Sequence, residues 1–240
     1  MRVVASRQQI LRIDTESADP VSAAVAAKVR DHLRRGIADA EVALAADYAK
    51  GLLTAESLPP EVIAAARAAG IPFCADPKPA NVDLFRGATL VSPNEAEALA
   101  AAGLGPGAQA SRLPNGRAAT AGPTGLPEAV RCAGQALRER LGADAVFVTR
   151  GDQGIAVFLA DYVAQVPAFH APGDLGDPTG CGDAVSAVSA LTLTVVGHQD
   201  AASYLEAATL ANAAGAVVSR FVGVHSPQAE EICQLLAQAS

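Results

Sequence analysis

The chain has 240 residues, of which half are hydrophobic and only 4% are aromatic, and its formal net charge is −7 at neutral pH. This length suits one α/β domain whose core is filled by small aliphatic side chains. The acidic balance and the absence of a lysine or arginine cluster argue against a nucleic-acid-binding surface. No apolar run has the length of a signal peptide or a membrane span. Four widely spaced cysteines without a C-x-x-C pair favour reduced thiols. We therefore expect a soluble, cytoplasmic protein with no nucleic-acid or membrane partner.

Strand and helix patterns alternate along most of the chain. Short strands are predicted at 2–5 and 10–13, and a helix runs from Pro20 to about residue 35, with the proline in its first turn. A second helix is predicted at 59–70. Further buried strands are predicted at 41–46, 71–76, 88–92 and 145–150. This alternation predicts a mostly parallel sheet, in which these four strands are neighbours and helices cover both faces.

The segment 103–127 interrupts this alternation. It is rich in glycine and proline, which predicts a flexible surface insertion without packed structure. A helix at about 130–141 and a strand at 145–150 follow it, and residues 151–154 then form a hairpin turn. Because the α/β pattern resumes beyond the insertion, we expect residues 1–240 to form one domain. Two alanine-rich helices are predicted at about 183–196 and 200–220.

The hairpin and the last two helices are separated by a glycine-rich turn that points to phosphate chemistry. Gly180, Cys181, Gly182 and Asp183 lead directly into an apolar run of helical length. Glycines allow backbone amides to approach an anion closely, and the first turn of a helix presents unpaired N–H groups to it. Asp183 would lie beside that anion, where a carboxylate could accept the proton of an attacking hydroxyl. Taken alone, the same pattern also fits an ordinary turn between a loop and a helix.

The stretch Asp177-Pro178-Thr179-Gly180-Cys181-Gly182-Asp183 resembles the D-T-x-G-A-G-D signature of the ribokinase-like (PfkB) carbohydrate kinases. In that family the glycine turn is the anion hole for the transferred phosphate and the aspartate is the catalytic base. The resemblance implies a three-layer α/β/α sandwich with these roles for Gly180, Cys181, Gly182 and Asp183, and ATP and Mg²⁺ as cofactors. Cys181 replaces the usual alanine, a small change where only backbone is needed, and Pro178 is a further departure that a loop tolerates.

Three more groups of residues gain candidate roles from the same resemblance. Asn94 and Glu97 match an N-x-x-E motif that organises water around Mg²⁺ and the phosphates, although they also fit a helix capping box. Asn212, on the helix at 200–220, is a candidate for the edge of the adenine, although it also fits a solvent-facing position. The third group resembles the T-x-G-x-x-G turn beside the nucleotide phosphates and consists of Thr149, Arg150, Gly151 and Gly154.

Two lysines follow the ends of predicted strands, where ligands bind in open α/β sheets. Lys50 lies in Asp47-Tyr48-Ala49-Lys50-Gly51, and Lys78 lies in Asp76-Pro77-Lys78. Within the family these segments resemble S-D-Y-x-K-G and D-P-K-G of bacterial heptose-phosphate kinases, with Pro79 in place of the last glycine. The resemblance implies that Lys50 and Lys78 contact substrate or nucleotide phosphates, although each also fits a solvated surface lysine.

Members of the family normally carry roughly a hundred residues before the segment that begins this chain. Since that portion supplies the lid and most of the sugar-binding residues, we expect an N-terminally truncated ribokinase-like fold without a lid. The expected activity is ATP-dependent phosphorylation of a sugar-phosphate hydroxyl, most like heptose 7-phosphate. Two alternatives remain open: a kinase of the same fold for another sugar or nucleoside, and a catalytically silent nucleotide-binding remnant or half of a split kinase. We expect a homodimer or a complementing N-terminal chain as the macromolecular partner.

Overall fold

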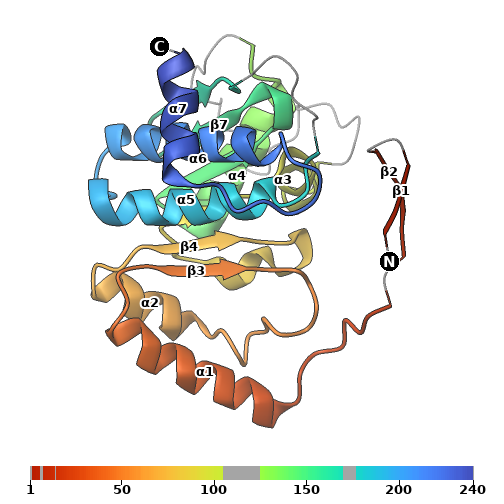
Figure 1. The fold of residues 1–240 in the computed structure, drawn as a ribbon. Helices are drawn as coiled ribbons and strands as arrows, with labels where there is room; N and C mark the ends of the chain where they lie inside the picture. The colour runs from red at the N-terminus through yellow and green to blue at the C-terminus, as the bar shows by residue number, and fades with distance from the viewer. Residues whose placement is uncertain (1, 6–7, 14, 105–124, 170–176, 240) are drawn as a thin grey trace.

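The computed structural model describes residues 2–5, 8–13, 15–104, 125–169 and 177–239, and its centre is a mixed six-stranded sheet (Figure 1). The strands follow one another across the sheet in chain order. They are β3 (Ala43–Ala46), β4 (Phe73–Asp76), β5 (Leu90–Val91), β6 (Ala145–Thr149), β7 (Ile155–Phe158) and β8 (Val163–Val166). The first four strands are parallel, which confirms the four predicted neighbours, whereas β7 and β8 are antiparallel.

Helices cover both faces of this sheet, as the α/β pattern predicts. One face packs against α1 (Ala23–Ala38), α2 (Pro60–Ala68), the 3₁₀ helix η1 (Pro79–Phe85), α3 (Glu95–Ala101) and α4 (Glu128–Leu141). The other face packs against α5 (Cys181–Val196) and α6 (Ala201–Val218), and α7 (Ala229–Ala239) packs on α6 (Figure 1). The result is a three-layer α/β/α sandwich.

The central strands are apolar throughout because both of their faces are buried. In β6, Val146 and Val148 pack toward α3 and α4, while Ala145 and Phe147 pack toward α5 and α6. This continuous apolar pattern is typical of strands covered on two sides. Small side chains also bring α5 and α6 together, since a Cβ added to Gly215 of α6 would lie 3.1 Å from Cγ2 of Val185 on α5.

Several details differ from the sequence-based expectations. The first long helix begins at Ala23 with Ser22 as its N-cap, so Pro20 precedes the helix and is not in its first turn. Strand β8 and helix α7 were not anticipated. Most of the expected insertion at 103–127 lies outside the described residues. The antiparallel pair β1 (Arg2–Ala5) and β2 (Gln8–Arg12) forms a separate two-stranded sheet, apart from the main one in Figure 1. None of the described helices combines the length and apolarity needed to cross a membrane.

Candidate active site

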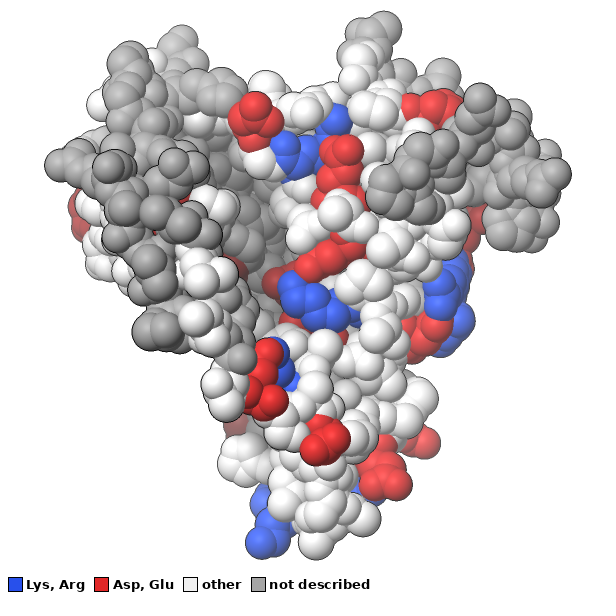
Figure 2. Space-filling view, turned by 90° about the vertical axis from the view of Figure 1, so that its right-hand side faces the viewer, with Lys and Arg blue, Asp and Glu red and all other residues white. Residues whose placement is uncertain are grey.

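A small cavity opens where the carboxyl ends of the parallel strands meet the first turn of α5. Its volume is about 180 Å³. Figure 2 views this side of the molecule, toward which β3 and β4 point in Figure 1, and shows acidic and basic side chains intermingled down a hollowed middle band. The lining residues come from β4, β6, α3 and α5 and from the segments that follow β3, β4 and β5: Tyr48, Asp76, Lys78, Ser92, Asn94, Glu97, Thr149, Gly182 and Asp183. This is the edge of an open parallel sheet at which ligands bind.

The glycine turn starts α5 as the sequence predicts. Gly180 is the N-cap residue with φ of 82°, a left-handed conformation that glycine adopts without strain. Asp177 holds the turn, because its Oδ1 accepts the amide of Thr179 at 3.0 Å and its Oδ2 accepts the amide of Gly223 at 2.8 Å. The amide of Cys181 donates to the carbonyl of Pro178 at 3.2 Å. That amide is therefore already used within the turn.

The side chain of Cys181 points away from the cavity. Its Sγ lies 3.5 Å from the carbonyl oxygen of Gly215 on α6 and 3.7 Å from that of Asp177. Burial and the charge of Asp177 raise the pKa of this thiol. Position 181 thus keeps its side chain out of the cavity, as expected for a replacement of alanine.

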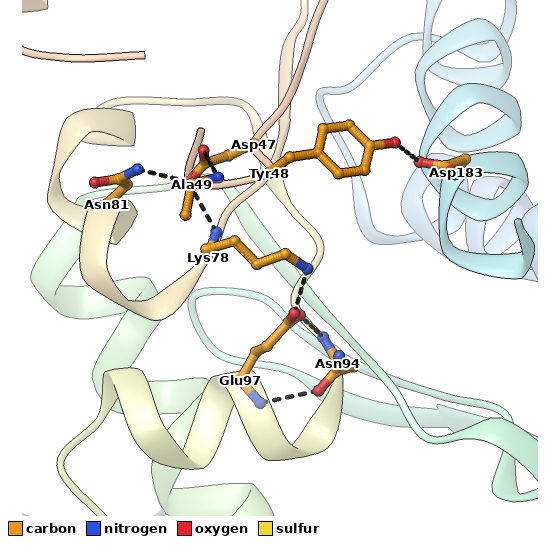
Figure 3. A network of polar contacts seen from close by, with 8 residues as sticks. All are labelled: Asp47, Tyr48, Ala49, Lys78, Asn81, Asn94, Glu97 and Asp183. Atoms are coloured by element: carbon orange, nitrogen blue, oxygen red, sulfur yellow. Dashed lines mark hydrogen bonds and ion pairs between the residues drawn. The ribbon is translucent and has the colours of Figure 1, made fainter. Parts of the chain in front are cut away.

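Asp183, in the first turn of α5, is hydrogen-bonded to a side chain from the other side of the cavity. The hydroxyl of Tyr48, which follows β3, donates to Oδ1 of Asp183 at 2.6 Å (Figure 3). This hydrogen bond is the main reason why the pKa of Tyr48 is raised to about 12, and burial adds to the effect. The carboxylate of the candidate base is therefore held by a phenol from the opposite side of the cavity.

Asn94 and Glu97 form the capping box that their spacing allows. Oδ1 of Asn94 accepts the amide of Glu97 at 2.9 Å, and Oε2 of Glu97 accepts the amide of Asn94 at 3.0 Å. The other oxygen of Glu97, Oε1, lies 2.5 Å from Nζ of Lys78 (Figure 3). The capping role and a role at the cavity are therefore compatible, because different oxygens of the same carboxylate serve them.

Asp76, the last residue of β4, is a cavity carboxylate that the sequence analysis did not single out. Burial raises its pKa to about 6, the negative charges of Glu97, Asp183 and Asp47 add to the rise, and the charge of Lys78 opposes it. Its position at a strand end, two residues before Lys78, was the available signal. The same holds for Tyr48, which was noted only as part of a motif.

The remaining predicted residues lie around the cavity or away from it. Thr149 lines it, and its amide donates to the carbonyl of Pro93 at 3.0 Å. The side chain of Arg150 is buried and its Nε donates to Glu95 at 2.8 Å. Gly151 and Gly154 bound a turn closed by the amide of Gly154 donating to the carbonyl of Gly151 at 3.1 Å.

Lys50 and Asn212 are not among the residues that line this cavity. Nζ of Lys50 is paired with the carboxylate of Glu16. Asn212 is buried, not solvent-facing, and its Nδ2 donates to the carbonyl of Pro167 at 2.7 Å. The structure therefore brings together Asp183, Gly182, Asn94, Glu97, Thr149 and Lys78 from the predicted set.

The charge of the cavity fits a hydrated Mg²⁺ ion. Three carboxylates, those of Asp76, Glu97 and Asp183, line it together with the single ammonium group of Lys78. Among the described residues, no group of three or more histidine, cysteine, aspartate or glutamate side chains is arranged to hold a metal directly. Mg²⁺ keeps several water ligands in many sites, so contact through water suits this arrangement.

Comparison with known proteins places this chain in a family. Residues 48–231 match the family model described as pfkB family carbohydrate kinase. The chain is 38% identical over 234 residues to bifunctional protein HldE of Geobacter metallireducens and 36% identical over 239 residues to bifunctional protein HldE of Gluconobacter oxydans. These matches cover 96% and 99% of the chain, but only 42% and 44% of the relatives. The chain therefore spans less than half the length of these curated relatives.

Solved structures give the same fold. Ribokinase of Arabidopsis thaliana, complexed with ribose and ATP, superposes with a TM-score of 0.64 at 22% identity, covering 86% of this chain and 58% of that one. Ribokinase of Giardia lamblia gives a TM-score of 0.68 at 18% identity, with coverages of 88% and 63%. The fold is ribokinase-like, and with the family match over most of its length the chain belongs to the pfkB family of carbohydrate kinases.

Proposed function

We propose that the chain carries the phosphoryl-transfer part of an ATP-dependent sugar-phosphate kinase. The proposed acceptor is a sugar phosphate most like heptose 7-phosphate. One observation carries this proposal. Asp183 lies at the start of α5, next to the glycine turn and on the same cavity as Lys78, Asn94 and Glu97. Phosphoryl transfer needs a base, an anion-binding helix terminus, a cation, and carboxylates that suit hydrated Mg²⁺.

In this proposal Asp183 accepts the proton of the attacking hydroxyl. The N-terminus of α5 stabilises the transferred group through its dipole and its unpaired amides, which favour negative charge. Gly180, Cys181 and Gly182 shape this turn, although the amide of Cys181 donates to Pro178 in the present conformation. Mg²⁺, held through water by Asn94 and Glu97, would neutralise charge that develops on the phosphates.

Lys78 is the cavity residue suited to contact a phosphate group of ATP or of the sugar. Its ammonium group lies on the cavity wall, where a phosphate oxygen could replace or share its contact with Glu97. Lys50 keeps its proposed phosphate contact only if it leaves Glu16, because that pair holds it away from the cavity. The 149–154 turn and α6, with Asn212, remain the proposed nucleotide side.

A second candidate fits the same observations. The chain spans 42% to 44% of the HldE proteins and about three fifths of the solved ribokinase-fold chains. A silent nucleotide-binding remnant, or one half of a kinase that another chain completes, fits the same cavity. A pfkB kinase for a different sugar or nucleoside fits it as well, because the acceptor sets this choice.

The experiment that tests the proposal measures binding and turnover side by side. MgATP binding is measured by calorimetry, and phosphoryl transfer is measured with a panel of sugar phosphates, sugars and nucleosides. Both are run on this chain and on a version extended by the upstream coding region. Transfer to heptose 7-phosphate supports the first proposal, and transfer to another acceptor supports the other kinase. Binding without transfer in both versions supports the remnant, and absence of MgATP binding contradicts all three.

A further inference from the structure

The orientation of Asp183 depends on one contact. Asp183 is exposed, and an exposed carboxylate on the first turn of a helix can adopt several rotamers. Within the described parts of the chain, the Tyr48 hydroxyl is the only hydrogen-bond partner that its side chain has. At 2.6 Å this is a short, charge-assisted hydrogen bond from O–H to a carboxylate. Tyr48 therefore selects the rotamer that Asp183 adopts.

Tyr48 can fix Asp183 because its own backbone is fixed on both sides. The preceding residue, Asp47, is only 3% exposed. Its Oδ1 accepts the amide of Ala49 at 2.8 Å, and its Oδ2 accepts the amide of Lys78 at 3.1 Å and Nδ2 of Asn81 at 3.0 Å (Figure 3). The buried carboxylate thus ties this loop to the one that follows β4.

The following residue completes this support. Ala49 has φ of 52°, the only left-handed conformation outside glycine among the described residues. A non-glycine residue holds that conformation only where its surroundings impose it. Here the hydrogen bond from the Ala49 amide to Asp47 does so. Tyr48 is therefore presented from a loop that the hydrogen bonds of Asp47 hold in place, although Tyr48 itself is 56% exposed.

We propose that Tyr48 is a positioning residue, which orients Asp183 for the proposed phosphoryl transfer by occupying Oδ1 and leaving Oδ2 to accept the proton of the attacking hydroxyl. The inference rests on the proposed function. Tyr48 itself loses no proton, since its raised pKa keeps the phenol neutral at physiological pH. The arrangement has the logic of a catalytic base that a third group orients. Tyr48 contributes by reducing the number of orientations that the Asp183 carboxylate samples.

The test is the Tyr48→Phe variant, which keeps the ring and removes only the hydroxyl. We expect kcat to fall by roughly 5-fold to 100-fold, as when a reacting group loses its alignment, with KM for MgATP unchanged. Tyr162→Phe is the matched control, because Tyr162 is also largely exposed and does not line this cavity. In a double-mutant cycle, Tyr48→Phe should have little further effect on Asp183→Asn, since both remove the same unit.

The outcomes separate this inference from the proposed function. A fully active Tyr48→Phe variant, or losses that add in the double variant, would contradict the role of Tyr48 and leave the proposed function intact. A wild-type chain that binds MgATP but transfers phosphate to no acceptor contradicts the proposed kinase activity instead.

A second readout does not require turnover. At a pH of about 10 an ordinary tyrosine is half ionised. The absorbance difference between the wild type and Tyr48→Phe should show Tyr48 still protonated at that pH, and more ionised once Asp183→Asn removes the negative charge of the carboxylate. A Tyr48 that ionises like an ordinary tyrosine in the wild type would overturn the inference.

Discussion

Nζ of Lys78 lies 2.5 Å from Oε1 of Glu97, and this pair joins the loop after β4 to the first turn of α3. Burial opposes the charge on Lys78, but the hydrogen bond and the charge of Glu97 outweigh it, so the pKa of Lys78 is raised. Lys78 therefore stays charged throughout the physiological range. A bound phosphate would compete with Glu97 for the ammonium group, and Mg²⁺ would compete with Lys78 for the carboxylate.

The first prediction concerns Glu97→Gln. The amide oxygen of glutamine can still accept the backbone N–H of Asn94, so the capping box and α3 should remain. The loss of charge should raise the Mg²⁺ concentration needed for half-maximal ATP binding by roughly 10-fold to 100-fold, the usual effect of removing a group that orients metal-bound water. The measurement is calorimetric titration of ATP at several Mg²⁺ concentrations. Glu128→Gln is the control, because Glu128 occupies the first turn of α4 outside the cavity. Unchanged Mg²⁺ dependence in Glu97→Gln would remove Glu97 from the metal site.

The second prediction concerns Asp183→Asn. The substitution keeps the size of the side chain and an oxygen for Tyr48, but removes the base. We expect kcat to fall by roughly 10²-fold to 10⁴-fold, the usual range for loss of a general base. ATP affinity should stay similar or rise slightly, since one negative charge near the phosphates is lost. Turnover and calorimetry on the same preparation check both, with Asp31→Asn on α1 as the control. Loss of ATP binding together with activity would show that Asp183 holds the turn and is not the base.

The third prediction concerns the pH dependence of stability through Asp76. Its pKa is 3.8 in the absence of the fold and about 6 in the folded protein, so the folded state binds the proton more tightly. The Asp76 carboxyl therefore stabilises the fold fully below about pH 4, and this stabilisation is lost as the pH rises through about 6. Asp76→Asn should therefore raise the free energy of unfolding above pH 6 by on the order of 1–3 kcal/mol, and change it little at pH 4.

Urea denaturation at both pH values, with a metal chelator present, measures the Asp76 effect. The chelator matters because a bound cation would stabilise the ionised carboxylate and reduce the difference. Equal effects of Asp76→Asn at the two pH values would contradict a raised pKa. With Mg²⁺ added, the gain in stability above pH 6 should shrink, which connects Asp76 to the cation-binding cavity.

The fourth prediction compares two glycines of the turn between β6 and β7. A Cβ at Gly154, where φ is 83°, would lie 2.0 Å from the carbonyl oxygen of Val166, so the backbone would have to move. Gly154→Ala should cost at least about 3 kcal/mol of stability, the scale of a strained or overpacked site. Gly151 has φ of 56° and no atom near its Cβ position, so Gly151→Ala should cost only about 1–2 kcal/mol. Urea denaturation midpoints measure the stability loss of each variant. Equal losses in Gly154→Ala and Gly151→Ala would refute the clash with the Val166 carbonyl.

The sequence predicts the sheet well where the local signals and the tertiary packing agree. The four parallel strands are short apolar runs bounded by charge, glycine or proline, which is the local signal of a strand. Strand β8 was missed because Val163-Ala164-Gln165-Val166 is short and its pairing with β7 is what makes it a strand. Pro20 was misplaced because Ser22 competes for the N-cap.

The candidate site could be predicted only in part, for a physical reason. Asp183, Asn94, Glu97 and Lys78 stand in short motifs, whereas the contact between Tyr48 and Asp183 joins residues 135 positions apart. No local pattern encodes such a contact, which arises from packing β3 beside α5. Likewise, the pairing of Lys50 with Glu16 depends on how the segment before α1 returns past β3. The ends of the predicted strands identified the edge of the sheet where the cavity lies. They did not identify which side chains near those ends line the cavity.

The strand that presents Asp47 and Tyr48 also leaves the sheet open to extension. In the described part of the chain β3 pairs with β4 alone, and its residues, Ala43 to Ala46, are alanine and leucine without a charge or a proline. Such an outer strand offers a row of backbone donors and acceptors to any extended segment. Leu44, 42% exposed, adds an apolar contact for an incoming chain. The purified chain should therefore self-associate as its concentration rises, which light scattering at several concentrations measures.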